Sequence, residues 1–173
     1  MRSLCGSGGG DWKLRDGKWG GGWFLPVVGG LIGLDQVTKL WVEGTMKLGL
    51  EIPVLPGLFS LTRVHNTGVA FGVGQGNNAV TGLVACGVLV LAAWIARSWD
   101  WQKRWIQAVA GLIAGGAIGN LIDRARLGYV LDFLDFHYGR LSWPSFNVAD
   151  AAISVGVGLV VLAWITGKPM EKK

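Results

Sequence analysis

The chain alternates between long apolar runs and short polar segments. Four stretches contain no Asp, Glu, Lys or Arg, at residues 19–34, 64–96, 105–122 and 151–167. A helix rises about 1.5 Å per residue and a hydrocarbon core is about 30 Å thick, so each run is close to the length that spans a membrane. The pattern predicts an all-α transmembrane bundle of four helices, at about residues 23–41, 79–96, 105–122 and 149–166.

A different pattern occupies the connection between the first two predicted helices. Pro53, Pro56 and Gly57 precede the segment 58–64, in which every second residue faces the same side of a strand. A single strand with a free edge is costly at a membrane surface, so we expect a small antiparallel sheet in this connection. Its register does not follow from the pattern.

Small residues form a ladder on the third predicted helix. Gly111, Gly115 and Gly119 recur every four residues, and Gly29 and Gly33 repeat this spacing on the first helix. Such faces let helix backbones approach closely, so we expect the two to pack together. The alternative is that the glycines shape a substrate groove.

Composition agrees with a membrane protein. Charged residues make up 16% of the chain and hydrophobic residues 51%, whereas about a quarter of a typical soluble domain is charged. Ten of the 16 Lys and Arg residues fall in 32 residues at positions 1–18, 97–104 and 168–173. The positive-inside rule then places both termini in the cytoplasm, and it explains the net charge of +5 without a nucleic-acid partner.

The ends of the chain differ from its centre. Residues 1–22 are basic and glycine-rich, and we expect a disordered cytoplasmic tail followed by an uncleaved signal anchor. Residues 23–167 form the single membrane domain, and residues 168–173 a basic cytoplasmic tail. Cys5 and Cys86 would lie in different environments, so no disulfide is expected.

Charged residues occur near the outer ends of the first and third helices. Asp35 and Lys39 are one helical turn apart, either as an ion pair that ends the span and snorkels or as part of a site. On the third helix Asn120 shares a face with Asp123 or Arg124. Buried polar groups in a membrane are functional candidates, and ion pairing among these residues is the equal alternative.

Two further aspartates, Asp132 and Asp150, have apolar flanks. Two buried carboxylates that meet can share one proton, which provides an acid and a base at neutral pH, as in aspartic proteases. The helix dipole at the start of the fourth helix favours Asp150 as the first base and leaves the proton on Asp132. Spacing alone leaves Asp35 and Asp123 as further candidates.

Other chemistries fit the residues less well. His65 and His137 have no metal-ligand spacing, and the glycine-rich segments lack the context of a phosphate loop, so no metal and no cofactor are expected. A proton or cation pathway would need polar residues in the inner half of the bundle. A non-catalytic adaptor, in which the acids pair with Lys39, Arg124 and Arg126, is a second rival.

Five motifs in order resemble those of the lipoprotein signal peptidase family, also called signal peptidase II. They are DQVTK at 35–39, NTGVAF at 66–71, GGAIGNLIDR at 115–124, VLDF at 130–133 and FNVAD at 146–150. The resemblance covers about residues 23–166 and leaves out both tails.

This resemblance implies a bacterial inner-membrane aspartic endopeptidase with a periplasmic sheet that cradles its substrate, and we expect a monomer among membrane lipids. Its substrates would be diacylglyceryl-modified prolipoproteins, cut just before the lipidated cysteine. The resemblance assigns Asp132 and Asp150 as the catalytic pair. By the same resemblance, the residues that line the site are Asn66, Gly68, Asn120, Arg124 and Asn147. The residues that support it are Asp35, Lys39, Asp123 and Ala149.

Overall fold

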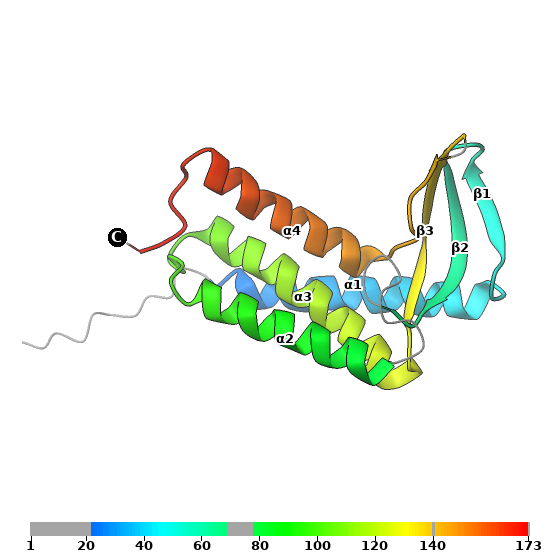
Figure 1. Cartoon of the computed structure of the whole chain (residues 1–173), viewed down its shortest axis with the longest axis horizontal. Coiled ribbons are helices and arrows are strands. Elements are labelled where there is room, and N and C mark those ends of the chain that lie inside the picture. The colour runs from blue at the N-terminus through cyan, green and yellow to red at the C-terminus, as the bar shows by residue number, and fades with distance from the viewer. Residues whose placement is uncertain (1–21, 69–77, 140, 173) are drawn as a thin grey trace, which may run out of the picture.

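A computed structural model describes residues 22–68, 78–139 and 141–172. Its four helices run side by side, and a sheet stands across one end of them (Figure 1). The helices are α1 (Phe24–Thr45), α2 (Asn78–Ala96), α3 (Arg104–Leu127) and α4 (Val148–Ile165). The strands are β1 (Glu51–Leu55), β2 (Phe59–Asn66), β3 (Val130–Tyr138) and β4 (Leu141–Ser142).

All four predicted helices are present, but α1 and α3 each continue about one turn beyond the expected end. We had ended both helices near charged residues, and in the structure Asp35, Lys39 and Asp123 are fully buried and paired within the bundle. The end of α3 is set instead by Gly128, whose φ of 81° is a left-handed conformation that glycine adopts without strain.

Two helices in the described part of the chain, α3 and α4, are long and apolar enough to cross a membrane, with mean hydropathies of 1.5 and 2.2. The described apolar part of α2 is shorter, at Thr81–Ala96. The division into two tails and one domain stays a prediction, and residues 1–21 of the N-terminal tail lie outside the described residues.

The glycine ladder of α3 packs on α1, as predicted. A Cβ atom at Gly111 would lie 2.9 Å from the Val27 side chain, and one at Gly115 would lie 3.1 Å from that of Leu31. The prediction for Gly29 and Gly33 is wrong, because a Cβ at either would meet nothing within 4 Å. Close contact on the α1 side is made by larger side chains that fill the groove of the α3 glycines.

A second set of glycines, which we did not predict, joins α3 to α4. A Cβ at Gly116 would collide with the carbonyl oxygen of Ala149, and one at Gly156 would lie 2.6 Å from the Ile113 side chain. The four-residue spacing identifies only the face of α3 that carries Gly111, Gly115 and Gly119. Gly116 lies next to that ladder, on the face toward α4. Helix α3 is therefore the central helix, with α1 and α4 packed against it.

The sheet is antiparallel, with strand order β1-β2-β3-β4. The predicted strand at 58–64 corresponds to β2, but the sheet is not confined to the connection between the first two helices, as we had expected. Strands β3 and β4 come from the connection between α3 and α4. We had interpreted residues 130–133 only as a motif, although Val130 to Phe133 are all buried and form a core strand.

An apolar cluster fastens this sheet to the helices. Val42 and Met46 near the end of α1 pack against Leu131 and Phe133 of β3. Leu131 and Val42 have no exposed surface. The cluster fixes β3 beside the bundle and so determines where Asp132, the residue between Leu131 and Phe133, is placed.

Candidate active site

Asp132 on β3 and Asp150 in the first turn of α4 meet where the sheet joins the bundle. Two asparagine side chains connect them. The Asn147 amide donates to Asp132 Oδ1 at 2.7 Å, and the Asn120 amide donates to Asp150 Oδ1 at 2.7 Å. The Asn147 amide also lies 3.2 Å from Asn120 Oδ1, so one hydrogen-bond network contains both carboxylates.

Asp150 is held in place by a capping box at the start of α4. Its backbone N–H donates to the side-chain oxygen of Asn147, the N-cap, at 3.0 Å. In return the Asn147 backbone N–H donates to Asp150 Oδ2 at 3.3 Å. The carboxylate therefore lies at the positive end of the helix dipole with both of its oxygens engaged.

Asn66 and Arg124 complete the surroundings of Asp132. The Asn66 amide donates to Asp132 Oδ2 at 2.9 Å, while its own oxygen accepts the Gly68 N–H at 2.9 Å. Arg124 donates to the carbonyl oxygen of Gly68, also at 2.9 Å. All five residues expected to line the site thus lie in this network. Residues 69–71, the rest of the motif that begins at Asn66, lie outside the described residues.

The environment of Asp132 favours its protonated form. Its side chain is only 2% exposed, and burial together with the negative charge of Asp150 raises its pKa to about 7. The amides of Asn66 and Asn147 oppose this shift, because they donate hydrogen bonds to the charged carboxylate. A carboxyl group with this pKa can hold a proton beside a second carboxylate at neutral pH.

Behind the two aspartates lies a buried ionic triad of Asp35, Lys39 and Asp123. Lys39 Nζ lies 2.8 Å from Asp35 and 2.9 Å from Asp123, and all three side chains have no exposed surface. The ammonium group also donates to Asn120 Oδ1 at 3.0 Å, which accounts for its three protons. The pairing among these residues is therefore confirmed, whereas the snorkelling interpretation of Asp35 and Lys39 is wrong.

The triad positions the backbone on both sides of the site. Asp35 Oδ1 accepts the backbone N–H of Ala149 at 3.0 Å, and Asp123 Oδ2 accepts that of Leu131 at 3.1 Å. Each of these N–H groups is next in sequence to one of the two aspartates, Asp150 or Asp132. The triad also orients Asn120, because Lys39 takes its oxygen and leaves its NH₂ group for Asp150.

Gln36 is a member of this network that we did not predict. Its side-chain amide donates to Asp123 Oδ1 at 2.9 Å and to Asp35 Oδ2 at 3.2 Å. We had quoted Gln36 only as part of a motif. Gln36 is only half-buried, and its place one residue after Asp35 in the DQVTK motif was the signal that its side chain could join the polar groups of this helix.

An apolar helical body whose polar network gathers at one end is the architecture of a membrane enzyme, and solved structures share it. One bacterial membrane enzyme, determined at 2.3 Å resolution, matches with a TM-score of 0.75 and 28% identity, over 86% of this chain and 93% of that one. A second, at 1.9 Å resolution, matches with a TM-score of 0.67 and 28% identity, over 81% of this chain and 90% of that one.

The sequence comparison names the family. Residues 27–166 match the model of the signal peptidase (SPase) II family, and the chain belongs to that family. A lipoprotein signal peptidase of Trichormus variabilis is 43% identical over 136 residues, which cover 79% of this chain and 85% of that protein. One from Syntrophotalea carbinolica is 42% identical over 144 residues, covering 79% and 88% respectively.

Proposed function

We propose that this protein removes signal peptides from prolipoproteins and that Asp132 and Asp150 form its catalytic aspartyl pair. The observation that carries the proposal is the network in which Asn147 and Asn120 hold the two carboxylates. Membership of the signal peptidase II family and the names of the relatives support the substrate class.

The proposed reaction is hydrolysis by a water molecule bound between the two carboxyl groups. Ionised Asp150 removes a proton from this water, whose oxygen attacks the scissile carbonyl carbon. Protonated Asp132 donates to the carbonyl oxygen, which carries the developing negative charge. When the C–N bond breaks, the leaving nitrogen takes a proton from the pair, and the products are a carboxylic acid and an amine. The two carboxyl groups share one proton as a coupled pair. Asp150 as base and Asp132 as acid therefore describe the state in which Asp132 holds that proton.

The asparagines act as positioning residues in this mechanism. The Asn147 and Asn120 amides already donate to the carboxylates, so they hold the acids rather than the substrate. Arg124 donates to the Gly68 carbonyl and orders the chain beside Asn66.

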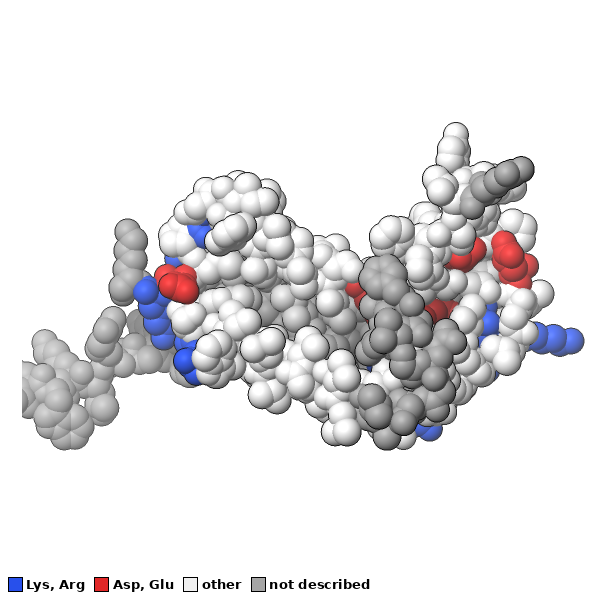
Figure 2. Space-filling view, in the orientation of Figure 1, with Lys and Arg blue, Asp and Glu red and all other residues white. Residues whose placement is uncertain are grey.

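We further propose that all four helices span the bacterial inner membrane, with the sheet in the periplasm and both termini in the cytoplasm. Figure 2 shows Lys and Arg near the two ends of the molecule, separated by a wide uncharged surface. Large apolar side chains of the helices are exposed, among them Leu25 of α1, Leu83 of α2 and Trp164 of α4 at 73%, 73% and 82%. A lipid-facing belt accounts for such exposure, which would be unfavourable in water.

This topology suits a lipid-anchored substrate. The aspartates lie at the sheet end of the bundle, which the proposal places at the outer membrane interface (Figure 1). A diacylglyceryl group on the cysteine after the scissile bond would hold that bond at the same depth. The proposed cut therefore falls just before the lipidated cysteine.

The rival functions fit the network less well. Amides of Asn66, Asn147 and Asn120 donate to the two acids, so the acids are not simply ion-pair partners, as the adaptor hypothesis requires. Arg126, one of the cations that hypothesis used, pairs with Glu43 at 3.5 Å. The transporter hypothesis needs a path through the bundle, whereas the acids cluster at one end.

The experiment follows conversion of a diacylglyceryl-modified precursor by the purified protein in lipid vesicles. Asp132→Asn and Asp150→Asn should each abolish conversion, and Asp100→Asn at the opposite end of the bundle is the matched control. Normal cleavage by both folded variants would refute the proposed pair. Loss in Asp123→Asn, with activity retained in Asp132→Asn, would assign the second aspartate differently.

A further inference from the structure

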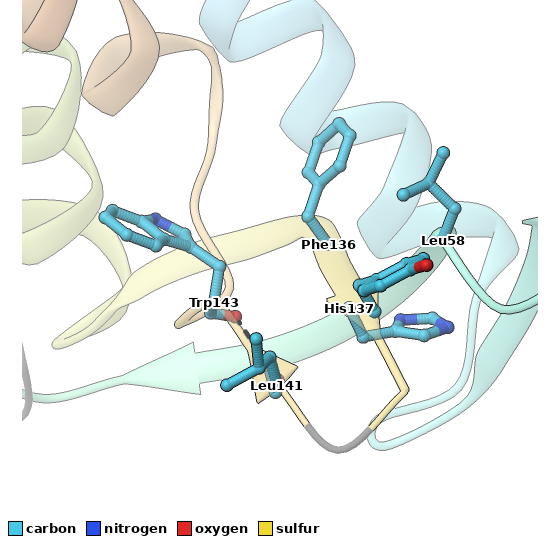
Figure 3. Close-up of a pocket in the computed structure, with 7 residues that line it drawn as sticks. Leu58, Phe136, His137, Leu141 and Trp143 are labelled. Carbon is cyan, nitrogen blue, oxygen red and sulfur yellow. Dashed lines mark hydrogen bonds between the residues drawn. The ribbon is translucent and has the colours of Figure 1, made fainter.

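Three side chains with metal-binding groups meet on the sheet, apart from the aspartyl pair. Glu51 lies on β1, and Asp135 and His137 lie on β3; one potential ligand atom of each is within 4.8 Å of the others. Side chains alternate along a strand, so Asp135 and His137 project from the face of β3 opposite to Asp132. In Figure 3 the Phe136 ring and the His137 imidazole leave the strand on opposite sides.

Strand register explains the meeting. Asp135 is paired with Ser60 of β2, and Ser60 is paired with Pro53 of β1. Residues opposite each other in antiparallel strands project to the same face, as do residues two apart on one strand. Glu51, Ser60, Asp135 and His137 therefore share one face, although Glu51 is far from the others in sequence. Our expectation of no metal site rested on sequence spacing, which does not detect ligands brought together by strand pairing.

An ion pair alone accounts for only part of this cluster. His137 Nδ1 lies 3.3 Å from Asp135 Oδ2, and Ser145 donates to Asp135 Oδ1 at 3.3 Å. The Glu51 side chain forms no hydrogen bond or ion pair with the described residues, yet its carboxylate is within 4.8 Å of that of Asp135. Two carboxylates at this separation repel each other, and a cation between them would reverse the sign of the interaction.

Ser60 provides an independent indication of a ligand. It has no exposed surface, and its hydroxyl finds no hydrogen-bond partner among the described residues. A buried hydroxyl left without a partner costs about 1–3 kcal/mol, so such groups are normally satisfied by protein or by bound water. Its register places this hydroxyl on the face of Asp135, beneath the cluster.

We propose that Glu51, Asp135 and His137 bind one divalent transition-metal ion, and that the Ser60 hydroxyl hydrogen-bonds to a water or ligand oxygen on it. Two carboxylates and one imidazole are a ligand set that suits Zn²⁺, and their two negative charges balance the ion. Tetrahedral ligands at about 2.0–2.2 Å from zinc are about 3.4 Å apart, so the ligand atoms need to move by roughly 1 Å. Glu51 is exposed and free to make this movement.

The ion would connect β1 to β3 across β2. Strand β1 is exposed along its whole length and is paired on one side only, so its position depends on few contacts. A metal link would hold this edge strand in the sheet. The site would thus stabilise the outer sheet and take no part in peptide hydrolysis.

The test measures Zn²⁺ binding to the full-length protein in detergent by equilibrium dialysis, after removal of metal. We expect one zinc ion per chain. His137→Gln and Glu51→Gln should each weaken binding by at least about tenfold, since loss of even indirect ligand support costs about 10–100-fold. Ser60→Ala should weaken it by less. Glu171→Gln, an exposed carboxylate at the opposite end of the protein, is the matched control and should bind normally.

Two further readouts separate this site from other sources of binding. Co²⁺ in the zinc site should show visible absorption bands without the near-ultraviolet thiolate band that Cys5 or Cys86 would produce. Metal should also raise the unfolding temperature of the wild type but not of Glu51→Gln, a substitution at an exposed position that the fold tolerates. No binding, or binding equal to wild type in both His137→Gln and Glu51→Gln, would overturn the proposal and leave an Asp–His ion pair.

Discussion

The buried triad allows a quantitative test of how the site is held, through the substitution Lys39→Met. Lys39 has no exposed surface and contacts Asp35, Asp123 and Asn120 at 2.8, 2.9 and 3.0 Å. Methionine has a similar length but no charge, so the substitution leaves two carboxylates buried without their cation. Breaking a buried ion pair in this way costs about 3–5 kcal/mol. Since domains are stable by about 5–15 kcal/mol, this is a large part of the total.

The free energy of unfolding would be measured by denaturant titration in detergent micelles. Lys47→Met, at an exposed position beyond the end of α1, is the matched control and should change stability by less than about 0.5 kcal/mol. Adding Asp35→Asn and Asp123→Asn to Lys39→Met removes the unpaired charges and should recover part of the loss.

Activity should not recover with stability in the combined variant. Lys39 holds the oxygen of Asn120, and this contact directs the asparagine NH₂ group at Asp150. Unfolding of Lys39→Met at the same denaturant concentration as wild type would show that the buried triad does not stabilise the fold. Full cleavage by the stabilised combined variant would show that the triad does not orient the site.

Three further predictions concern the same site. Because burial and the charge of Asp150 raise the pKa of Asp132 to about 7, the folded protein holds a proton there that the unfolded chain releases near pH 4. Stability should therefore fall between about pH 4 and 7, by roughly 4 kcal/mol for this group. Denaturant titrations should show a smaller fall in Asp132→Asn than in the wild type, and an equal fall would contradict the assignment. Gly116→Ala should separate α3 from α4 at Ala149 and lower both stability and activity. Gly33→Ala, in open space, should leave activity unchanged and add up to about 1 kcal/mol to the free energy of unfolding. If the two variants had equal effects in thermal unfolding and cleavage assays, the packing of α3 on α4 would be contradicted. Asn147→Ala removes the N-cap of α4 and a hydrogen-bond donor to Asp132. About 1–2 kcal/mol of stability and most of the cleavage rate should be lost. A normal cleavage rate would show that the Asn147 amide is not needed.

The helices could be predicted because their signal is local. An uncharged run is visible in the sequence wherever it lies, and the four helices were found with ends accurate to within about a turn. Where the ends were wrong, the reason was tertiary. Asp35, Lys39 and Asp123 look like residues that terminate a membrane span, and only their mutual pairing lets α1 and α3 continue past them.

The sheet was only half predictable. Strand β2 shows an alternating pattern, whereas β3 begins with a fully buried run that cannot be distinguished from a helix end or a motif by periodicity. Its pairing with β2 joins residues 64 to 77 positions apart, from Asn66 with Val130 to Phe59 with Phe136. Long-range pairing of this kind also determines the Glu51, Asp135 and His137 cluster, and no sequence spacing indicates it.

For the site, chemistry identified the class of residue and the family resemblance selected the pair. Four aspartates were candidates from composition and position. The structure divides them, because Asp35 and Asp123 are paired with Lys39, while Asp132 and Asp150 are held by the side chains of asparagines. The division depends on which acid reaches the lysine, and this is a property of the packed bundle.

The most direct test of the central claim is a crystal structure with a peptide inhibitor whose scissile carbonyl is replaced by a hydroxyl-bearing tetrahedral carbon. This hydroxyl takes the place of the attacking water. The account predicts that it lies between Asp132 and Asp150, within hydrogen-bond distance of both carboxyl groups. A hydroxyl bound to Asp123, or to only one of the two proposed aspartates, would contradict it.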